Sequence, residues 1–250
     1  MKDVMTRALV LRTGHFREID IWLKLLLPGS GIQTAFAFGG AKSKHRFPGC
    51  LDVLNTLNCR LRTSGRGQFL TLEEACLLEG PVTLRSNWSR MGLAANCLRF
   101  LEVLDVSADN AEAAFALVEA LRSTLESRAS VSQLFPLFFR FALACRVGYA
   151  PDLVRCGLCG RSLGQTLAFF QVSEGLMLCA GCRHSPETVR QQLPVSWPVR
   201  RLLLAVQKDE PRDWQDLANV EDRRACSTLI DGFIQYHLGI VWDRGGFRKL

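Results

Sequence analysis

The first 80 residues place apolar and polar side chains in alternation over five short runs, which is typical of strands that bury one face. Glycine-, serine- and proline-rich turns separate the runs. The runs cover residues 4–13, 17–27, 32–40, 51–62 and 68–78. Five short strands at this spacing predict a small β-barrel, and the five-stranded OB-fold has this strand count. An SH3-like barrel fits the same periodicity, so both remain open.

After Pro81 the apolar positions recur with the period of an α-helix. Pro136 falls inside one helical pattern, and we expect that helix to begin near it, because proline is tolerated in a first helical turn. The C-terminal residues 242–250 are short and basic, and we expect them to be frayed. Helices are predicted over residues 86–105, 109–127, 130–147, 185–193, 196–208 and 220–238.

Composition places the chain among ordinary globular proteins, since 48% of its 250 residues are hydrophobic and 22% are charged. It has no run of eighteen apolar residues, so no transmembrane helix is expected. Asp3, Arg7 and Arg12 interrupt the apolar N-terminus, which excludes a signal peptide. We therefore expect a soluble, cytoplasmic protein without a membrane partner.

The net charge of +7 is unevenly distributed along the chain. Residues 1–66 contain eleven Lys and Arg against four Asp and Glu, whereas residues 67–250 contain twenty of each kind. This asymmetry indicates a polyanionic partner, and nucleic acid before a membrane, because no basic amphipathic helix accompanies it. The alternative is a solvated basic face with no partner.

Four of the ten cysteines form two C-x2-C pairs separated by nineteen residues, Cys156 with Cys159 and Cys179 with Cys182. This spacing falls in the range of zinc sites, where each short pair places two thiolates on one tetrahedral ion. Between the pairs, two apolar runs flank a Ser-Glu-Gly turn, which predicts a β-hairpin and hence a zinc ribbon. We expect one structural Zn²⁺ per chain.

Other uses of these cysteines fit the sequence less well. Disulfides are disfavoured without a secretory signal, and a redox site would need one pair rather than two. His184 could replace one ligand, but four thiolates already close the shell and leave no open position for catalysis. We expect the metal to stabilise an insertion that has little core of its own. The expected fold is α+β, with an OB-fold domain over residues 1–80 and a helical domain over residues 81–250 that carries the ribbon at about residues 153–184.

The sequence contains no complete catalytic motif of the kinds considered. Lys42 and Ser43 resemble the end of a phosphate-binding P-loop, but Ala41 and Phe36 stand where the motif requires glycine. The four histidines lie far apart in sequence, and none neighbours an obvious nucleophile. An enzyme whose site is assembled only by the fold remains the least favoured class.

Basic residues of the predicted barrel fit phosphate contacts better. OB-folds hold single strands with a cationic groove and stacking aromatic rings, for which Phe16, Trp22 and Phe47 are candidates, although core packing is equally open to them. The candidate nucleic-acid-binding residues are Arg7, Arg12, Arg17, Lys42, Lys44, Arg46, Arg60, Arg62 and Arg66.

The chain resembles the bacterial DNA repair and recombination protein RecO family over nearly its full length. Three segments carry the resemblance, and their order, barrel, helices and paired cysteines, is distinctive. They are "ALVLRTGHFREIDIWLKLLLPGSGIQTAFAFGGAKSKHRFPGCLDVLN", "FRFALACRVGYAPDLVRCGLCG" and "FFQVSEGLMLCAGC".

The resemblance implies a non-catalytic mediator that binds single- and double-stranded DNA and anneals complementary strands. It also implies that the protein, together with RecR, loads RecA onto DNA covered by single-strand-binding protein, at the nucleoid in the cytoplasm. The family's basic loop corresponds here to Gly39, Lys42, Lys44 and Arg46. The alternative that the residues leave open is a zinc-ribbon RNA-binding or transcription-associated factor.

Overall fold

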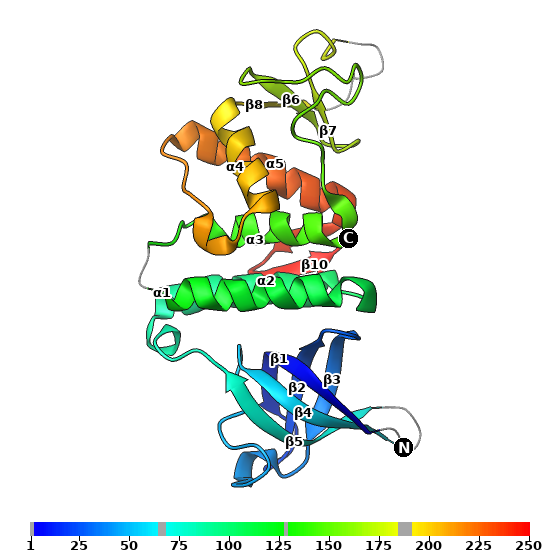
Figure 1. Ribbon diagram of the computed structural model, residues 1–250, viewed down its shortest axis with the longest axis vertical. Helices are drawn as coiled ribbons and strands as arrows, with labels where there is room; N and C mark the ends of the chain where they lie inside the picture. Colours follow the sequence, from blue (N-terminus) through cyan, green and yellow to red (C-terminus); the bar gives the residue numbers. More distant parts are fainter. Residues whose placement is uncertain (1–2, 65–68, 128–129, 185–191) are drawn as a thin grey trace. The chain divides into compact units, whose positions relative to one another are not determined.

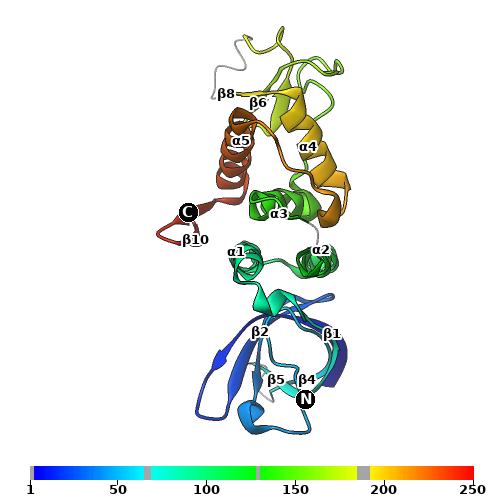
Figure 2. The same cartoon turned by 90° about the vertical axis from the view of Figure 1, so that its left-hand side faces the viewer.

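The computed structural model describes residues 3–64, 69–127, 130–184 and 192–250. The chain falls into two units, residues 1–92 with 105–127 and residues 93–104 with 128–250. Helix α1 (Trp88–Leu104) therefore begins in the first unit and ends in the second. Figures 1 and 2 label most of the helices and strands of the two units.

The first unit contains five strands that close into a barrel in the order β1-β2-β3-β5-β4. Strands β3 and β5 pair in parallel, and the other neighbours are antiparallel. The five predicted strands are confirmed, except that residues 51–55 form turns before the fourth strand. The strands are β1 (Asp3–His15), β2 (Ile21–Leu27), β3 (Gly31–Ala37), β4 (Thr56–Thr63) and β5 (Leu70–Glu79).

The pairing of β2 with β3 decides which side chains enter the barrel. Directly opposite residues share a face of an antiparallel pair, and Leu23 lies opposite Ala35 while Trp22 lies opposite Phe36. Leu23 and Ala35 are fully buried in the barrel core. Phe36 therefore lies on the outer face of the barrel with Trp22.

Helix α2 (Ala108–Glu126) completes the first unit by packing on β2 and β3. The buried Arg122 donates hydrogen bonds to Thr56 Oγ1 at 2.7 Å and to the carbonyl of Leu54 at 3.2 Å. At the start of β3, Ile32 N–H donates to the carbonyl of Val106 at 3.4 Å. The helix is thus attached to the barrel by polar as well as apolar contacts.

In the second unit, helices α3, α4 and α5 pack on one another, and β8 packs on α5 (Figure 2). Strands β6, β7 and β8 form one sheet in the order β7-β6-β8, and β9 and β10 form a separate hairpin. The bounds are α3 (Phe135–Ala144), β6 (Ala168–Gln171), β7 (Leu176–Leu178), β8 (Gln192–Val195), α4 (Trp197–Lys208), α5 (Val220–Leu238), β9 (Ile240–Asp243) and β10 (Gly246–Lys249).

Most of the predicted helices are confirmed, and Pro136 lies in the first turn of α3 as expected. The prediction that the C-terminal tail is frayed is wrong. Strands β9 and β10 pair there, and the ring centres of Trp242 and Phe247 lie 4.7 Å apart. The helix expected over residues 185–193 is wrong at its end, where Gln192 begins β8, and its residues 185–191 lie outside the described chain. No helix among the described residues is long and apolar enough to cross a membrane.

Candidate metal centre and nucleic-acid-binding face

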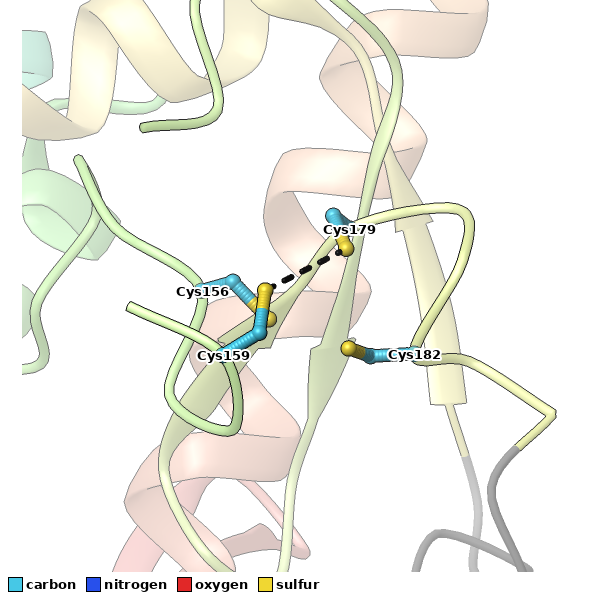
Figure 3. A group of neighbouring side chains, drawn as sticks. All are labelled: Cys156, Cys159, Cys179 and Cys182. Carbon is cyan, nitrogen blue, oxygen red and sulfur yellow. Dashed lines mark hydrogen bonds between the residues drawn. The ribbon is translucent and has the colours of Figure 1, made fainter. Parts of the chain in front are cut away.

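The two cysteine pairs converge at one end of the β6-β7 hairpin (Figure 3). All four Sγ atoms lie within 4.8 Å of one another, and those of Cys159 and Cys179 are 3.9 Å apart. A tetrahedral ion with Zn–S bonds of about 2.3 Å requires S···S separations of about 3.8 Å. The thiols therefore fit one tetrahedral metal ion, with Cys156 and Cys182 as the other two ligands.

Backbone amides around the cluster favour thiolates. Burial would raise the pKa of the Cys156 thiol, but the N–H groups of Cys159, Cys179 and Leu158 together outweigh burial and lower it to about 6. The N–H of Cys182 lowers the pKa of Cys179, while the thiols of Cys179 and Cys159 raise that of Cys182 to about 12. The amides thus favour the deprotonated form at Cys156 and Cys179, and it is the deprotonated thiol that ligates a metal ion.

The strands beneath the cysteines are anchored to helix α5. The hairpin predicted between the pairs is confirmed, since β6 pairs with β7. The ring of Phe170 packs against that of Phe233 at 6.1 Å, and His237 Nε2 lies 2.9 Å from the carbonyl of Val172. The hairpin thus packs on an element that lies outside the predicted insertion at about residues 153–184. His184 does not belong to the described cluster.

Three of the predicted DNA-binding arginines are engaged with carboxylates. Arg7 pairs with Glu119 of α2 at 2.8 Å and lies over the ring of Phe115. Two more lie among three acidic residues on β1 and β5. The contacts are Arg60 with Glu74 at 3.1 Å and with Asp3 at 4.0 Å, and Arg62 with Asp3 at 2.9 Å and with Glu73 at 3.4 Å. The positive charge of these arginines is largely compensated within the unit.

Lys42, Lys44 and Arg46 lie on the segment that follows β3, which we call the basic loop (residues 39–46). Gly39 has a φ of +68°, and its N–H donates to Asp20 Oδ1 at 2.7 Å. The N–H of Ala41 donates to the carbonyl of Ile19 at 3.0 Å, so the basic loop is fastened to the β1-β2 connection.

Lys42, Lys44 and Arg46 are exposed on the basic loop, and Arg17 is exposed on the neighbouring connection. Within the described part of the chain, neither Lys42 nor Lys44 makes an ion pair. The structure thus brings together basic side chains from two connections. Arg66 lies outside the described residues.

The three stacking candidates have different surroundings. Phe47 is 4% exposed in the barrel core, so the stacking hypothesis is wrong for it. Trp22 is half-buried on the outer face, with the Arg12 guanidinium 5.6 Å from its ring centre. It lies flat across β1 because Gly14 has no side chain there, where a Cβ would lie 2.7 Å from the indole. Phe16 is 49% exposed.

Three aromatic residues near these candidates were missed by the sequence reasoning, namely Phe36, Phe38 and Phe69. The alternation in residues 32–38 places the large side chains of the strand on one face and the small ones on the other. The large side chains suggest the buried face, but the barrel buries Ala35 and Ala37 instead. The pairing of this strand with β2 could have identified the outer face, because it places Phe36 opposite Trp22 rather than opposite the buried leucines.

Fold and site together define a class of protein in which a small basic β-barrel is joined to a helical unit that carries a cluster of four thiols able to hold a metal ion. Two family models cover this arrangement: Recombination protein O N terminal matches residues 1–81, and Recombination protein O C terminal matches residues 85–244. The chain belongs to the RecO family, and the resemblance seen in the sequence is confirmed.

Curated relatives are similar over nearly their full length. The DNA repair protein RecO of Lawsonia intracellularis is 38% identical over 98% of this chain and 99% of its own. That of Nitratidesulfovibrio vulgaris is 41% identical over 99% and 100%, and that of Oleidesulfovibrio alaskensis is 40% identical over 99% and 100%. Membership of this family gives the chain a role in DNA repair and recombination, with DNA as a partner.

Proposed function

We propose that the protein is a non-catalytic recombination mediator that binds single- and double-stranded DNA and anneals complementary strands. With RecR, it helps to load RecA onto DNA coated with single-strand-binding protein, in the cytoplasm at the nucleoid. The observation that carries the DNA-binding part is the basic loop, whose lysines have no carboxylate partner among the described residues. The partner proteins follow from the family resemblance alone.

We assign the barrel to the OB-fold class and the metal to zinc. The five strands close on themselves, as in the OB-fold, and all four ligands are thiolates, a donor set typical of structural Zn²⁺. In domain terms, residues 1–80 would form the DNA-binding domain and residues 81–250 the helical domain, with the ribbon at about residues 153–184. When bound, zinc would hold Cys156, Cys159, Cys179 and Cys182 together without an open coordination position.

The DNA contacts would centre on the basic loop and the β1-β2 connection. Arg17, Lys42, Lys44 and Arg46 are exposed there, and Arg12 is exposed on β1. Neutralising phosphates with such groups lowers the repulsion between two strands that must approach to pair. Arg7, Arg60 and Arg62 would contribute less, because their carboxylate partners already compensate them.

The experiment is the salt dependence of binding to a labelled single-stranded oligonucleotide. Each phosphate contact adds about 0.7 to the slope of log affinity against log salt for single strands. Lys42→Ala with Lys44→Ala should therefore reduce the slope by about 1.4. The matched control, Arg60→Ala with Arg62→Ala, removes the same net charge and should change the slope less.

A salt-independent affinity of the wild type would contradict the proposal. So would equal losses in the two double variants, because these would reflect net charge rather than contacts of the basic loop. Tighter binding to structured RNA than to DNA, without annealing of DNA strands, would favour the RNA-binding alternative instead.

A further inference from the structure

Four phenylalanine rings form one connected group on the outside of the barrel, which we call the phenylalanine platform. Phe36 is its centre, with ring-centre distances of 5.3 Å to Phe16, 6.3 Å to Phe38 and 5.8 Å to Phe69. Phe38 and Phe69 also meet, at 6.5 Å. The four rings come from the β1-β2 connection, from β3 and the residue after it, and from the residue before β5, so only the folded barrel assembles them.

The platform is unusually open to solvent for a group of this size. Phe16 is 49% exposed, Phe38 38% and Phe69 39%. Contiguous exposed apolar surface marks an interaction site more often than isolated exposed side chains do. The position of Phe69 is fixed, because Ser64 N–H donates to its carbonyl at 3.0 Å across the β4-β5 connection.

Cations border the platform and indicate what covers it. The guanidinium of Arg17 lies 5.1 Å from the ring centre of Phe16, and Arg46 of the basic loop donates a hydrogen bond to the carbonyl of Phe38. Of the two acidic residues in the β1-β2 connection, Asp20 is buried and accepts from Gly39, while Glu18 is exposed. An exposed aromatic surface with a cationic border complements a polyanion that carries apolar ring faces.

We propose that the phenylalanine platform binds the base faces of unpaired nucleotides, while Arg17 and the basic loop hold the adjacent phosphates. This inference rests on the proposed function and assigns the single-strand subsite within it. Aromatic side chains stack on any base and therefore do not select sequence. In a duplex each base is already stacked on its neighbours, so the platform distinguishes single strands from paired ones.

Stacking has a consequence for annealing. It occupies the faces of the bases and leaves their Watson–Crick edges accessible to a second strand. Once that strand has paired, the bases stack within the new duplex and leave the rings. The platform thus holds one strand in a form that can pair, and it releases the product.

The test compares binding of the full-length protein, prepared with its metal, to three DNA probes. They are a thymidine oligonucleotide, an abasic oligonucleotide of equal length, and a duplex. Phe16→Leu with Phe38→Leu keeps apolar side chains but removes two rings. We expect it to weaken binding to the thymidine probe at least about fivefold, since stacking contributes roughly 1–3 kcal/mol per base. Affinity for the abasic probe and the duplex, and the salt slope, should remain as in the wild type.

Two further variants complete the design. Phe16→Trp with Phe38→Trp retains the rings and should keep the wild-type affinity for the thymidine probe. Trp88→Ala removes a ring that is 87% exposed outside the platform, and it should have no effect.

The inference is overturned if the wild type binds the abasic and thymidine probes equally, or if the leucine variant binds the thymidine probe as the wild type does. The latter result would leave a protein partner as the occupant of the platform. Either result with a steep salt dependence leaves the proposed DNA binding intact. A wild type without salt-dependent DNA binding contradicts both.

Discussion

Cysteine shows most clearly how local surroundings set the chemistry of individual residues. Burial raises the pKa of the Cys59 and Cys226 thiols to about 12, so these side chains stay protonated and act as small apolar groups. At Cys156 the backbone N–H groups outweigh burial and lower the pKa to about 6. One residue type therefore serves as core packing in one place and, in another, belongs to a cluster that could hold a metal ion.

At this scale we predict that Cys179→Ser abolishes metal binding. The wild type should contain about one zinc per chain, because four thiolates close a tetrahedral shell and three hold the ion far less tightly. Zinc content by elemental analysis checks this, with the exposed Cys76→Ser, which lies outside the cluster, as the matched control. Protein prepared without chelator that contains no zinc, or a Cys179→Ser variant that keeps it, would contradict the metal centre.

At the scale of elements, the sequence predicted most strands and helices but not which face of β3 is buried. Alternation identifies two faces without saying which is inside, and here Ala35 and Ala37 fill the narrow barrel while Phe36 and Phe38 lie outside. The short hairpin of β9 and β10 was missed because four-residue strands hardly establish a period. The cysteine hairpin was predicted, since its turn and both pairs lie within one short segment.

The turn between β2 and β3 supports a prediction at this scale. Gly31 has a φ of +72°, and a Cβ there would lie 2.2 Å from the carbonyl oxygen of Val106. Gly31→Ala should therefore lower the free energy of unfolding by about 3 kcal/mol or more, from backbone strain and a clash with main chain. Gly29→Ala is the matched control, because nothing lies within 4 Å of its Cβ position.

Urea denaturation that follows the unfolding of the first unit measures the free energy of unfolding of both glycine variants. Gly29→Ala should stay within about 0.5 kcal/mol of the wild type, as surface substitutions usually do. If the two variants were equally stable, β3 would not begin against the segment that leads into α2.

For the molecule as a whole, the sequence indicated a nucleic-acid partner through charge, and the structure refines where that charge is available. The excess lies within residues 1–66, but Arg60 and Arg62 are compensated by acidic residues of β1 and β5. Such ion pairs form between residues that are distant in sequence, so counting charges along the chain does not reveal them. The phenylalanine platform escaped prediction for the same reason, because its rings come from three separate segments.

The most direct test of the account is the rate at which two complementary single-stranded oligonucleotides anneal, measured with a fluorescent pair and with no nucleotide cofactor. The wild type should accelerate annealing above the spontaneous rate, on bare strands and on strands coated with single-strand-binding protein. Lys42→Ala with Lys44→Ala should lose most of the acceleration, while Arg60→Ala with Arg62→Ala should retain it. A wild type that binds DNA but leaves the annealing rate at its spontaneous value would contradict the proposed mediator.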